Sequence, residues 1–287
     1  MRCRCDRTIS DEGGGQDNGG ARSNLHERLH GSAKLRRSYH KAQDAAVLPR
    51  IQRLMAKRPT YGYRRVTAVL SRELRAEGFA AVNHKRVYRI MKNNNLLLER
   101  SGFAHLERSH DCKVVMMRSN LRWCSDGLEF TCWNGEIIRA AFPIDACDRR
   151  IIAWRAVVSA GISGSDVRDM MLEAVEKRFN AFRAPGVVEL LSDNGSPYTA
   201  KDTRIFARQL GLKPCFTPVK SPQSNGMSKA FVKTLKRDYV SVTPLPDAET
   251  VLSLIGDRIE DYNEHHPHSG LKWRSPREFI RAATETA

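Results

Sequence analysis

The stretch "LRWCSDGLEF", residues 121–130, decides the fold class, because its apolar and polar residues largely alternate. Alternation with a period of two is typical of a β-strand that buries one face. Asp126 lies in the middle of this stretch, and burying an unpaired carboxylate has a high free-energy cost. The stretch therefore predicts a strand that carries a candidate metal-binding carboxylate.

Two further strands are expected directly after this one. The stretches "GEIIRAAFPIDACD" (residues 135–148) and "RRIIAWRAVV" (residues 149–158) have the same period of two. Short turns at Asn134-Gly135 and near Asp148 connect them. The three strands are therefore expected to pair antiparallel.

Helices and strands alternate in the rest of the chain. A helix is expected at residues 165–179, with Ser165 or Asp166 as its N-cap and a buried side formed by Val167, Met171, Ala174 and Val175. The elements expected after it are a buried strand at 186–193, a helix at 201–211 that Gly211 ends, a strand at 213–219 and long helices at 221–240 and 247–266. Together these elements predict an α/β layer fold with a mixed five-stranded sheet.

Asp193 follows the buried strand, at the end of a strand where open α/β sheets place their sites. Mg²⁺ prefers carboxylate oxygen, and two such ions about 4 Å apart activate an attacking oxygen and stabilise a leaving one. Asp126 and Asp193 are therefore candidate ligands for phosphoryl-transfer chemistry. The alternative is that Asp193-Asn194-Gly195 is only a turn, and the residues alone leave both interpretations open.

Residues 45–97 predict a small helix-turn-helix domain. Apolar residues recur at three- and four-residue steps in three short stretches, and Asn83 is the expected N-cap of the third helix. Lys85, Arg86, Arg89 and Lys92 lie on the third helix, away from its apolar side. A solvated basic surface is the simpler interpretation, but next to a DNA-type motif we favour contact with phosphates.

The composition points to an anionic partner. The chain has 287 residues, a formal net charge of +16 and a pI near 9.8. Nucleic acid is the simplest such partner, since the chain has neither an apolar run of transmembrane length nor a secretory signal. We therefore expect a cytoplasmic, nucleoid-associated protein without a membrane partner.

The cysteines argue against a disulfide framework. There are seven, scattered along the chain, which indicates free thiols in a reducing compartment. A zinc site is the alternative, since His26 and His30 are four residues apart and Cys3 and Cys5 precede them. No CxxC pair completes a tetrahedral set, so zinc is not expected.

Six stretches carry a resemblance to a known family: "PTYGYRRV", "VNHKRVYRIMKNN", "RWCSDGLEF", "LSDNGS", "SPQSNGMSKAFVKTLKRDY" and "YNEHHPHSGLKWRSPREF". In this order and spacing the chain resembles the second-frame (OrfB) transposases of bacterial insertion sequences, over residues 45–280. The resemblance implies a retroviral-integrase-type core of RNase H-like fold. It also implies a Mg²⁺-dependent (or Mn²⁺-dependent) DDE transposase that exposes 3′-OH ends and joins them to target DNA.

The resemblance places Asp126 and Asp193 as the first two metal-binding carboxylates. The family's third residue is a Glu in the pattern N-G-x-A-E-S/A-F, and this chain has Lys229 there. Lys236 matches the basic residue that the family has seven positions later, so the register of the helix is intact. The resemblance thus implies an integrase core that has lost one of its three carboxylates.

Lys229 brings the wrong charge to a metal site. At about 4 Å and an effective dielectric constant near 20, a unit charge and a divalent ion repel by about 8 kcal/mol, which is an upper bound for a flexible side chain. Glu129 is expected on the opposite strand face and Asp238 more than two helical turns away, so neither replaces the carboxylate. We expect weak metal binding and impaired strand transfer. A sequence error or a decaying element copy explains Lys229 more simply than a selected role.

The expected DNA contacts lie on three helices. They are Tyr63, Arg64, Arg65, Lys85, Arg86, Arg89, Lys233, Lys236 and Arg237. Lys229, Lys233 and Lys236 form one basic stripe, so DNA binding can survive where the chemistry fails.

The expected division of the chain is a disordered or divergent N-terminus (1–44), the helix-turn-helix domain (45–97), a linker (98–118), the integrase core (119–240) and a C-terminal helix with a basic tail (241–287). Expected partners are the DNA of element ends and target, further copies of the chain, and an upstream-frame helix-turn-helix protein. The alternative functions are a non-catalytic DNA-binding inhibitor of transposition and, less favoured, a nuclease that acts on RNA–DNA hybrids.

Overall fold

The computed structural model describes residues 43–99, 116–217 and 225–285, which all belong to one contact unit. The expectations for residues 1–42, including those on Cys3, Cys5, His26 and His30, lie outside the described residues. The same holds for most of the linker and for the start of the helix expected at 221–240. Within the described ranges, no helix combines the length and the apolar character that a membrane span requires.

Three helices form the first part of the described chain: α2 (Asp44–Lys57), α3 (Tyr63–Ala76) and α4 (His84–Asn93). They bury a shared apolar core that includes Ile51, Leu70 and Val87. Asn83 is the N-cap of α4, and its side chain accepts a hydrogen bond of 2.8 Å from the backbone N–H of Lys85. The expected helices and the expected cap are confirmed.

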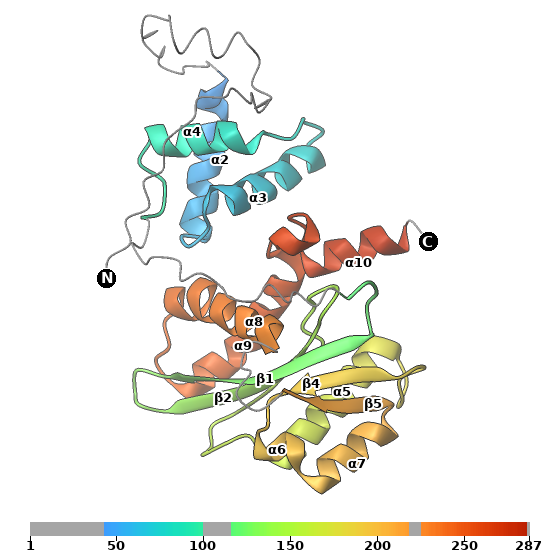
Figure 1. Cartoon of the computed structure of the whole chain (residues 1–287). Helices are drawn as coiled ribbons and strands as arrows, with labels where there is room; N and C mark the ends of the chain where they lie inside the picture. The colour runs from blue at the N-terminus through green and yellow to red at the C-terminus, as the bar shows by residue number, and fades with distance from the viewer. Residues whose placement is uncertain (1–42, 100–115, 218–224, 286–287) are drawn as a thin grey trace, which may run out of the picture. The chain divides into compact units, whose positions relative to one another are not determined.

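Five strands form one mixed sheet (Figure 1): β1 (Arg122–Thr131), β2 (Ile137–Asp145), β3 (Arg155–Val157), β4 (Val188–Ser192) and β5 (Leu212–Phe216). Their order is β3-β2-β1-β4-β5. β2 pairs antiparallel with β1 and β3, and β4 pairs parallel with β1 and β5. This is the mixed α/β sheet that the alternation of elements predicts, in the RNase H-like fold that the resemblance to the family implies.

Helices cover both faces of the sheet (Figure 1). Because side chains alternate along β1, Cys124 and Leu128 pack against α8 (Gly226–Asp238) and α9 (Ala248–His265), whereas Trp123 packs against α5 (Gly164–Phe179). The remaining helical segments are α6 (Ser196–Thr199), α7 (Lys201–Gln209), η2 (Val240–Val242), η3 (Ser269–Leu271) and α10 (Pro276–Thr284). Gly211 has a φ of +80° and follows α7, as expected.

The third strand is shorter than its sequence pattern suggests. The expectation covered residues 149–158, but β3 has three residues, and Ile151 forms only an isolated bridge to Ile144. Asn263 of α9 accepts a hydrogen bond from the N–H of Ile151 (2.9 Å) and donates one to its carbonyl (3.0 Å). One side-chain amide thus replaces the neighbouring strand here.

The cap expected for the helix after this strand was wrong by two or three residues. Ser163 is the N-cap of α5, and its hydroxyl accepts from the backbone N–H of Asp166 while the Asp166 carboxylate accepts from the backbone N–H of Ser163. The sequence places Ser163 and Ser165 two residues apart, and only the first has an acidic residue three positions later. A spacing of three residues between the serine and the acidic residue defines the capping box, and it identifies Ser163 as the N-cap.

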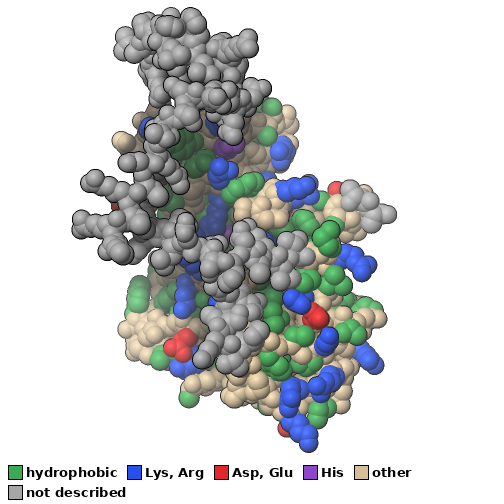
Figure 2. Space-filling view, viewed as in Figure 1, with side chains coloured by type: hydrophobic (Ala, Val, Ile, Leu, Met, Phe, Trp, Pro, Cys, Tyr) green, Lys and Arg blue, Asp and Glu red, His purple; other side chains and the backbone are tan. Residues whose placement is uncertain are grey.

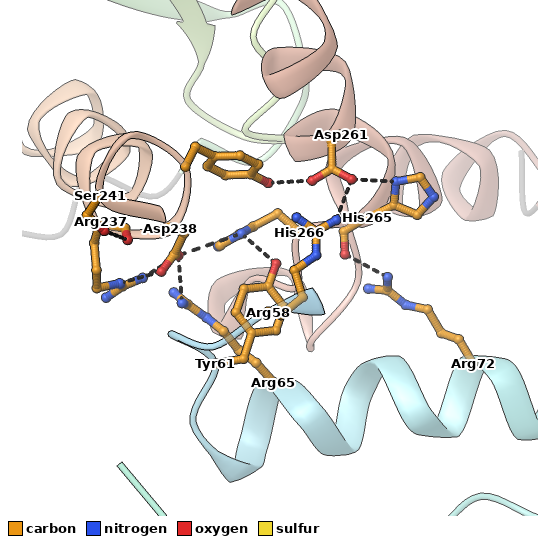
Figure 3. A network of polar contacts seen from close by, with 11 residues as sticks. Arg58, Tyr61, Arg65, Arg72, Arg237, Asp238, Ser241, Asp261, His265 and His266 are labelled. Atoms are coloured by element: carbon orange, nitrogen blue, oxygen red, sulfur yellow. Dashed lines mark hydrogen bonds and ion pairs between the residues drawn. The ribbon is translucent and has the colours of Figure 1, made fainter. Parts of the chain in front are cut away.

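A polar junction, defined here as Arg58, Tyr61, Arg65, Asp238, Asp261 and His266, connects the helical part to the core (Figure 3). Arg65 forms a 2.9 Å ion pair with Asp238, whose side chain is 1% exposed. Tyr61 and the Nδ1 atom of His266 are 3.1 Å apart. Burial is the main reason that the pKa of His266 is well below its ordinary value, so this ring is neutral.

Candidate functional site

The strand register brings the two candidate carboxylates level with each other. In the parallel pair of β1 and β4, Cys124 lies opposite Leu191. Asp126 lies two residues beyond that pair on β1, and Asp193 is the first residue after the end of the parallel strand β4. Both carboxylates thus lie at the same edge of the sheet, next to the paired part of two neighbouring parallel strands.

The electrostatics of Asp126 report the same proximity. Burial raises the pKa of the Asp126 carboxyl, the N–H of Gly127 lowers it through a 3.0 Å hydrogen bond, and the charge of Asp193 raises it again. The charge of Lys229 lowers this pKa and has the smallest effect of the four. Both other positions of the family pattern are therefore within electrostatic reach of Asp126.

Three side chains that the sequence analysis missed fix this geometry. Asn225, which is 2% exposed, donates a 2.9 Å hydrogen bond from its amide to the carbonyl of Ser125, and so ties the start of α8 to β1. The Ser125 hydroxyl donates to the carbonyl of Phe142 (3.0 Å) and lies 2.7 Å from the hydroxyl of Tyr198. Asn225 precedes a helix and is the Asn of the family pattern N-G-x-A-E-S/A-F, and these are the signals in the sequence for its role.

A cavity of about 550 Å³ opens beside Asp126. The residues that line it include Asp126, Lys229, Lys233, Lys236 and Arg237. The three lysines lie on one side of α8, as their spacing of four and three residues requires. Lys229 therefore shares a cavity with the first candidate carboxylate, in the position where the third was expected.

The residues present do not fit a pair of divalent metal ions. Among the described residues, no group of three or more His, Cys, Asp or Glu side chains could hold a metal ion. Glu129 forms a 2.7 Å ion pair with Arg139, and Asp238 is buried against Arg65. Two carboxylates and an ammonium group make a poorer donor set for Mg²⁺ than three carboxylates.

Ser228 is a second departure from the family pattern, which has Ala at this position. Ser228 is fully buried, and its hydroxyl has no hydrogen-bond partner among the described residues. A buried hydroxyl without a partner costs about 1–3 kcal/mol relative to an apolar group of similar shape. The helix that carries Lys229 thus contains a destabilising neighbour.

We expect Ser228→Ala to raise the free energy of unfolding by about 1 kcal/mol, because it removes the unpaired hydroxyl and improves helix propensity. Urea denaturation followed by circular dichroism measures this change. Ser253→Ala in α9 is the matched control: that hydroxyl is exposed and donates a 2.7 Å hydrogen bond to the carbonyl of Thr250, so no gain is expected. A loss of stability in Ser228→Ala would show that the hydroxyl has a partner.

The DNA-contact candidates of α3 lie at the start of the helix. Arg64 is exposed and lies 5.5 Å from the centre of the Tyr63 ring. Arg65 is paired with Asp238, and burial lowers the pKa of its guanidinium. A DNA contact of Arg65 would therefore compete with an existing ion pair, which is not the case for Arg64.

The candidates of α4 and α8 include exposed side chains and side chains that form ion pairs with aspartates. Lys85 and Arg89 are exposed, whereas Arg86 forms a 2.6 Å ion pair with Asp44. On α8, Lys233 and Lys236 are exposed, and Arg237 pairs with Asp238 at 2.6 Å. The α8 lysines line the cavity that contains Asp126.

Comparison with protein families identifies three regions of the chain. An integrase core domain matches residues 117–222, a second integrase core domain description matches residues 210–276, and an HTH-like domain matches residues 42–101. The bovine immunodeficiency virus integrase core is similar over 58% of this chain and 97% of that chain, with 21% identity and a TM-score of 0.41.

Two relatives come from bacterial insertion elements. Transposase InsD of insertion element IS2 from Escherichia coli is 51% identical over 247 residues, which are 86% of this chain and 81% of InsD. An uncharacterized protein of insertion element IS136 from Agrobacterium fabrum is 71% identical over 192 residues, which are 67% of this chain and 98% of that protein. With its HTH-like domain and integrase core domain, the chain belongs to the insertion-sequence OrfB transposases.

Proposed function

We propose that this transposase binds DNA and is impaired in strand transfer because Lys229 occupies the position of the third carboxylate. The observation that carries this proposal is the shared cavity of Asp126 and Lys229. The charge of Lys229 acts on the Asp126 carboxyl, although burial has the larger effect and raises the pKa of that group. An ammonium group in this cavity opposes a divalent cation there. Asp126 and Asp193 remain the proposed catalytic and metal-binding positions, with Mg²⁺ or Mn²⁺ weakly bound.

The charge of the cavity supports retained DNA binding. The described residues that line it include four basic side chains and one carboxylate. Lys and Arg are also far more frequent than Asp and Glu on the face shown in Figure 2. A surface of this kind attracts phosphates regardless of base sequence. The same excess of cations favours the second candidate function, a non-catalytic inhibitor that occupies element ends.

The organisation that we propose follows from the same features. Residues 45–97 act as the helix-turn-helix DNA-binding domain, residues 98–118 as the linker and residues 119–240 as the catalytic core, followed by the basic C-terminal part. The substrates are element ends and target DNA, on which several copies of the chain assemble. An upstream-frame helix-turn-helix protein supplies further recognition of the ends.

The salt dependence of DNA binding tests the role of the α8 lysines. Fluorescence anisotropy with a 30-base-pair duplex in EDTA should detect binding by the native chain without any divalent metal. Each of Lys229→Gln, Lys233→Gln and Lys236→Gln should reduce the slope of log K against log salt by about 0.9, the value for one lost phosphate contact. Lys213→Gln is the control, because Lys213 lies on β5 and pairs with Glu189 at 3.6 Å.

Two outcomes would contradict this proposal. If the native chain fails to bind the duplex in EDTA, DNA binding is not retained without metal. If Lys213→Gln changes the slope as much as the three α8 variants do, binding is diffuse and the cavity beside Asp126 does not contact DNA.

A further inference from the structure

A second cavity of about 500 Å³ lies on the other side of α8. Its lining includes the start of α3, the α8 residues Met227, Ala230 and Thr234, the loop after α9, and Arg149 from the turn after β2. Arg237 lines this cavity and also the one that contains Asp126. The two cavities are therefore neighbours that share a cationic side chain.

The lining of this second cavity is cationic and aromatic. It includes Arg64, Arg65, Arg149 and Arg237, and among the described residues that line it none is Asp or Glu. Arg65 and Arg237 are paired with Asp238, which is not itself a lining residue. Within the described ranges, the guanidinium groups of Arg64 and Arg149 have no carboxylate partner. Two arginines are thus available to an anionic ligand.

The position of Arg149 depends on a glycine. A Cβ atom on Gly270 would lie 2.2 Å from one terminal nitrogen of the Arg149 guanidinium. Any side chain at position 270 would therefore displace the end of Arg149, whereas the glycine lets the guanidinium lie directly against the backbone. The backbone of Arg149 has a φ of +62°, so the turn after β2 also directs this residue.

Trp273 supplies an aromatic surface in the same cavity. Trp273 is half-buried. Its backbone N–H donates a 2.8 Å hydrogen bond to the carbonyl of His268, and its carbonyl accepts a 3.1 Å hydrogen bond from Arg72. These two bonds fix the backbone that presents the indole to the cavity. Tyr63 also lines the cavity, but its ring already packs against that of Tyr88, with the ring centroids 5.1 Å apart.

We propose that this cavity binds a short segment of single-stranded DNA, with a phosphate at Arg149 and Arg64 and a base stacked on Trp273. Arginines combined with an aromatic surface are the features that recognise unpaired nucleotides. The volume lies within the range of about 300–1,000 Å³ typical of ligand sites and accommodates a nucleotide. A duplex keeps its bases stacked inside, so it offers nothing for Trp273 to stack on.

This inference rests on the proposed DNA-binding function and extends it to a strand that has separated from its partner. Because Arg237 borders both cavities, a single strand held at Arg149 continues towards Asp126 past that side chain. The second cavity thus supplies a place for unpaired nucleotides next to the candidate site.

Two binding measurements with the full chain test the proposal. Anisotropy compares a labelled ten-nucleotide oligo-dT with a 30-base-pair duplex. We expect the affinity for the single strand to fall on the order of tenfold in each of three variants: Arg149→Gln, Gly270→Ala and Trp273→Ala. This is the size expected for one lost stacking or phosphate contact. The affinity of the same variants for the duplex should change by less than about twofold. Trp273→Phe should restore most of the loss, since it keeps an aromatic ring.

Gly270→Ala and Lys272→Gln form a matched pair. Gly270→Ala removes no charge but displaces Arg149, whereas Lys272→Gln removes an exposed charge next to Trp273 that does not line the cavity. The proposal expects the first variant to lose single-strand affinity and the second to keep it. Thermal unfolding by circular dichroism checks that both variants are folded.

Photocrosslinking locates the strand directly. An oligo-dT that contains 4-thiothymidine should crosslink to the peptide with Trp273 or to that with Tyr63. If duplex binding persists while the variants bind single strands normally and crosslinks fall elsewhere, the inference is overturned and the proposed function stands. If the native chain binds neither DNA, both are overturned.

Discussion

Lys229→Glu is expected to join a pre-cut DNA end to target DNA at least about a thousandfold faster than the native chain in Mg²⁺. The full repulsion between an ammonium group and a divalent ion at about 4 Å is about 8 kcal/mol with an effective dielectric constant near 20. Because the side chain is exposed and flexible, we use half of this value, and about 4 kcal/mol already corresponds to about a thousandfold in rate. Gel electrophoresis of joined products measures the rate.

Three variants distinguish the effect of removing the positive charge from the effect of adding a metal-binding carboxylate. Lys229→Gln removes the repulsion without supplying a carboxylate, so it should recover only part of the activity. Lys233→Glu makes the same charge change on the same side of α8 and in the same cavity, and it should recover none. Asp193→Asn in the Lys229→Glu background should abolish joining. Equal joining by the native chain and Lys229→Glu would contradict the account.

Asp238→Ala is expected to destabilise the protein by about 3–5 kcal/mol. The Asp238 side chain is 1% exposed, and Arg65, 21% exposed, lies 2.9 Å from it. Removing one partner of a buried ion pair leaves the other charge buried and uncompensated, which is the origin of this cost. Urea denaturation at neutral pH measures the loss.

The control for Asp238→Ala is an exposed ion pair of the same type. Glu129 is 53% exposed and lies 2.7 Å from Arg139, so Glu129→Ala should cost less than about 1 kcal/mol. Replacing both buried partners, in Arg65→Met with Asp238→Leu, should restore most of the lost stability, because no buried charge remains without a partner. Equal costs for Asp238→Ala and Glu129→Ala would contradict a structural role of the junction.

The elements that the sequence predicts well are those with a strong period. The alternation in residues 121–130 and the apolar steps of α3 and α4 reappear as β1 and as two helices with the expected buried sides. The third strand could not be predicted in the same way. Its apolar residues are the same as in a strand, but Asn263, more than a hundred positions later, takes the hydrogen bonds of Ile151.

The candidate site divides in a similar manner. The family pattern names Asp126, Asp193 and Lys229, and the register of β1 and β4 explains why the first two meet. Asn225 and the Ser125–Tyr198 contact could not be found in the sequence, because their partners are distant in the chain and the bonds depend on the packing of α8 and α6 against β1. The ion pairs of Arg65 and Arg237 depend on packing in the same way.

Binding of Mn²⁺ by the native chain and by Lys229→Glu is the measurement that tests the central claim most directly. Electron paramagnetic resonance counts free Mn²⁺ during a titration and needs neither DNA nor activity. We predict that Lys229→Glu binds Mn²⁺ through Asp126 and Asp193 and that adding Asp193→Asn abolishes this binding. The native chain should bind Mn²⁺ at least about a hundredfold more weakly than Lys229→Glu. This difference is about 2.7 kcal/mol, well below the upper bound on the repulsion. Equal affinity of the native chain and Lys229→Glu would show that Lys229 does not obstruct the site.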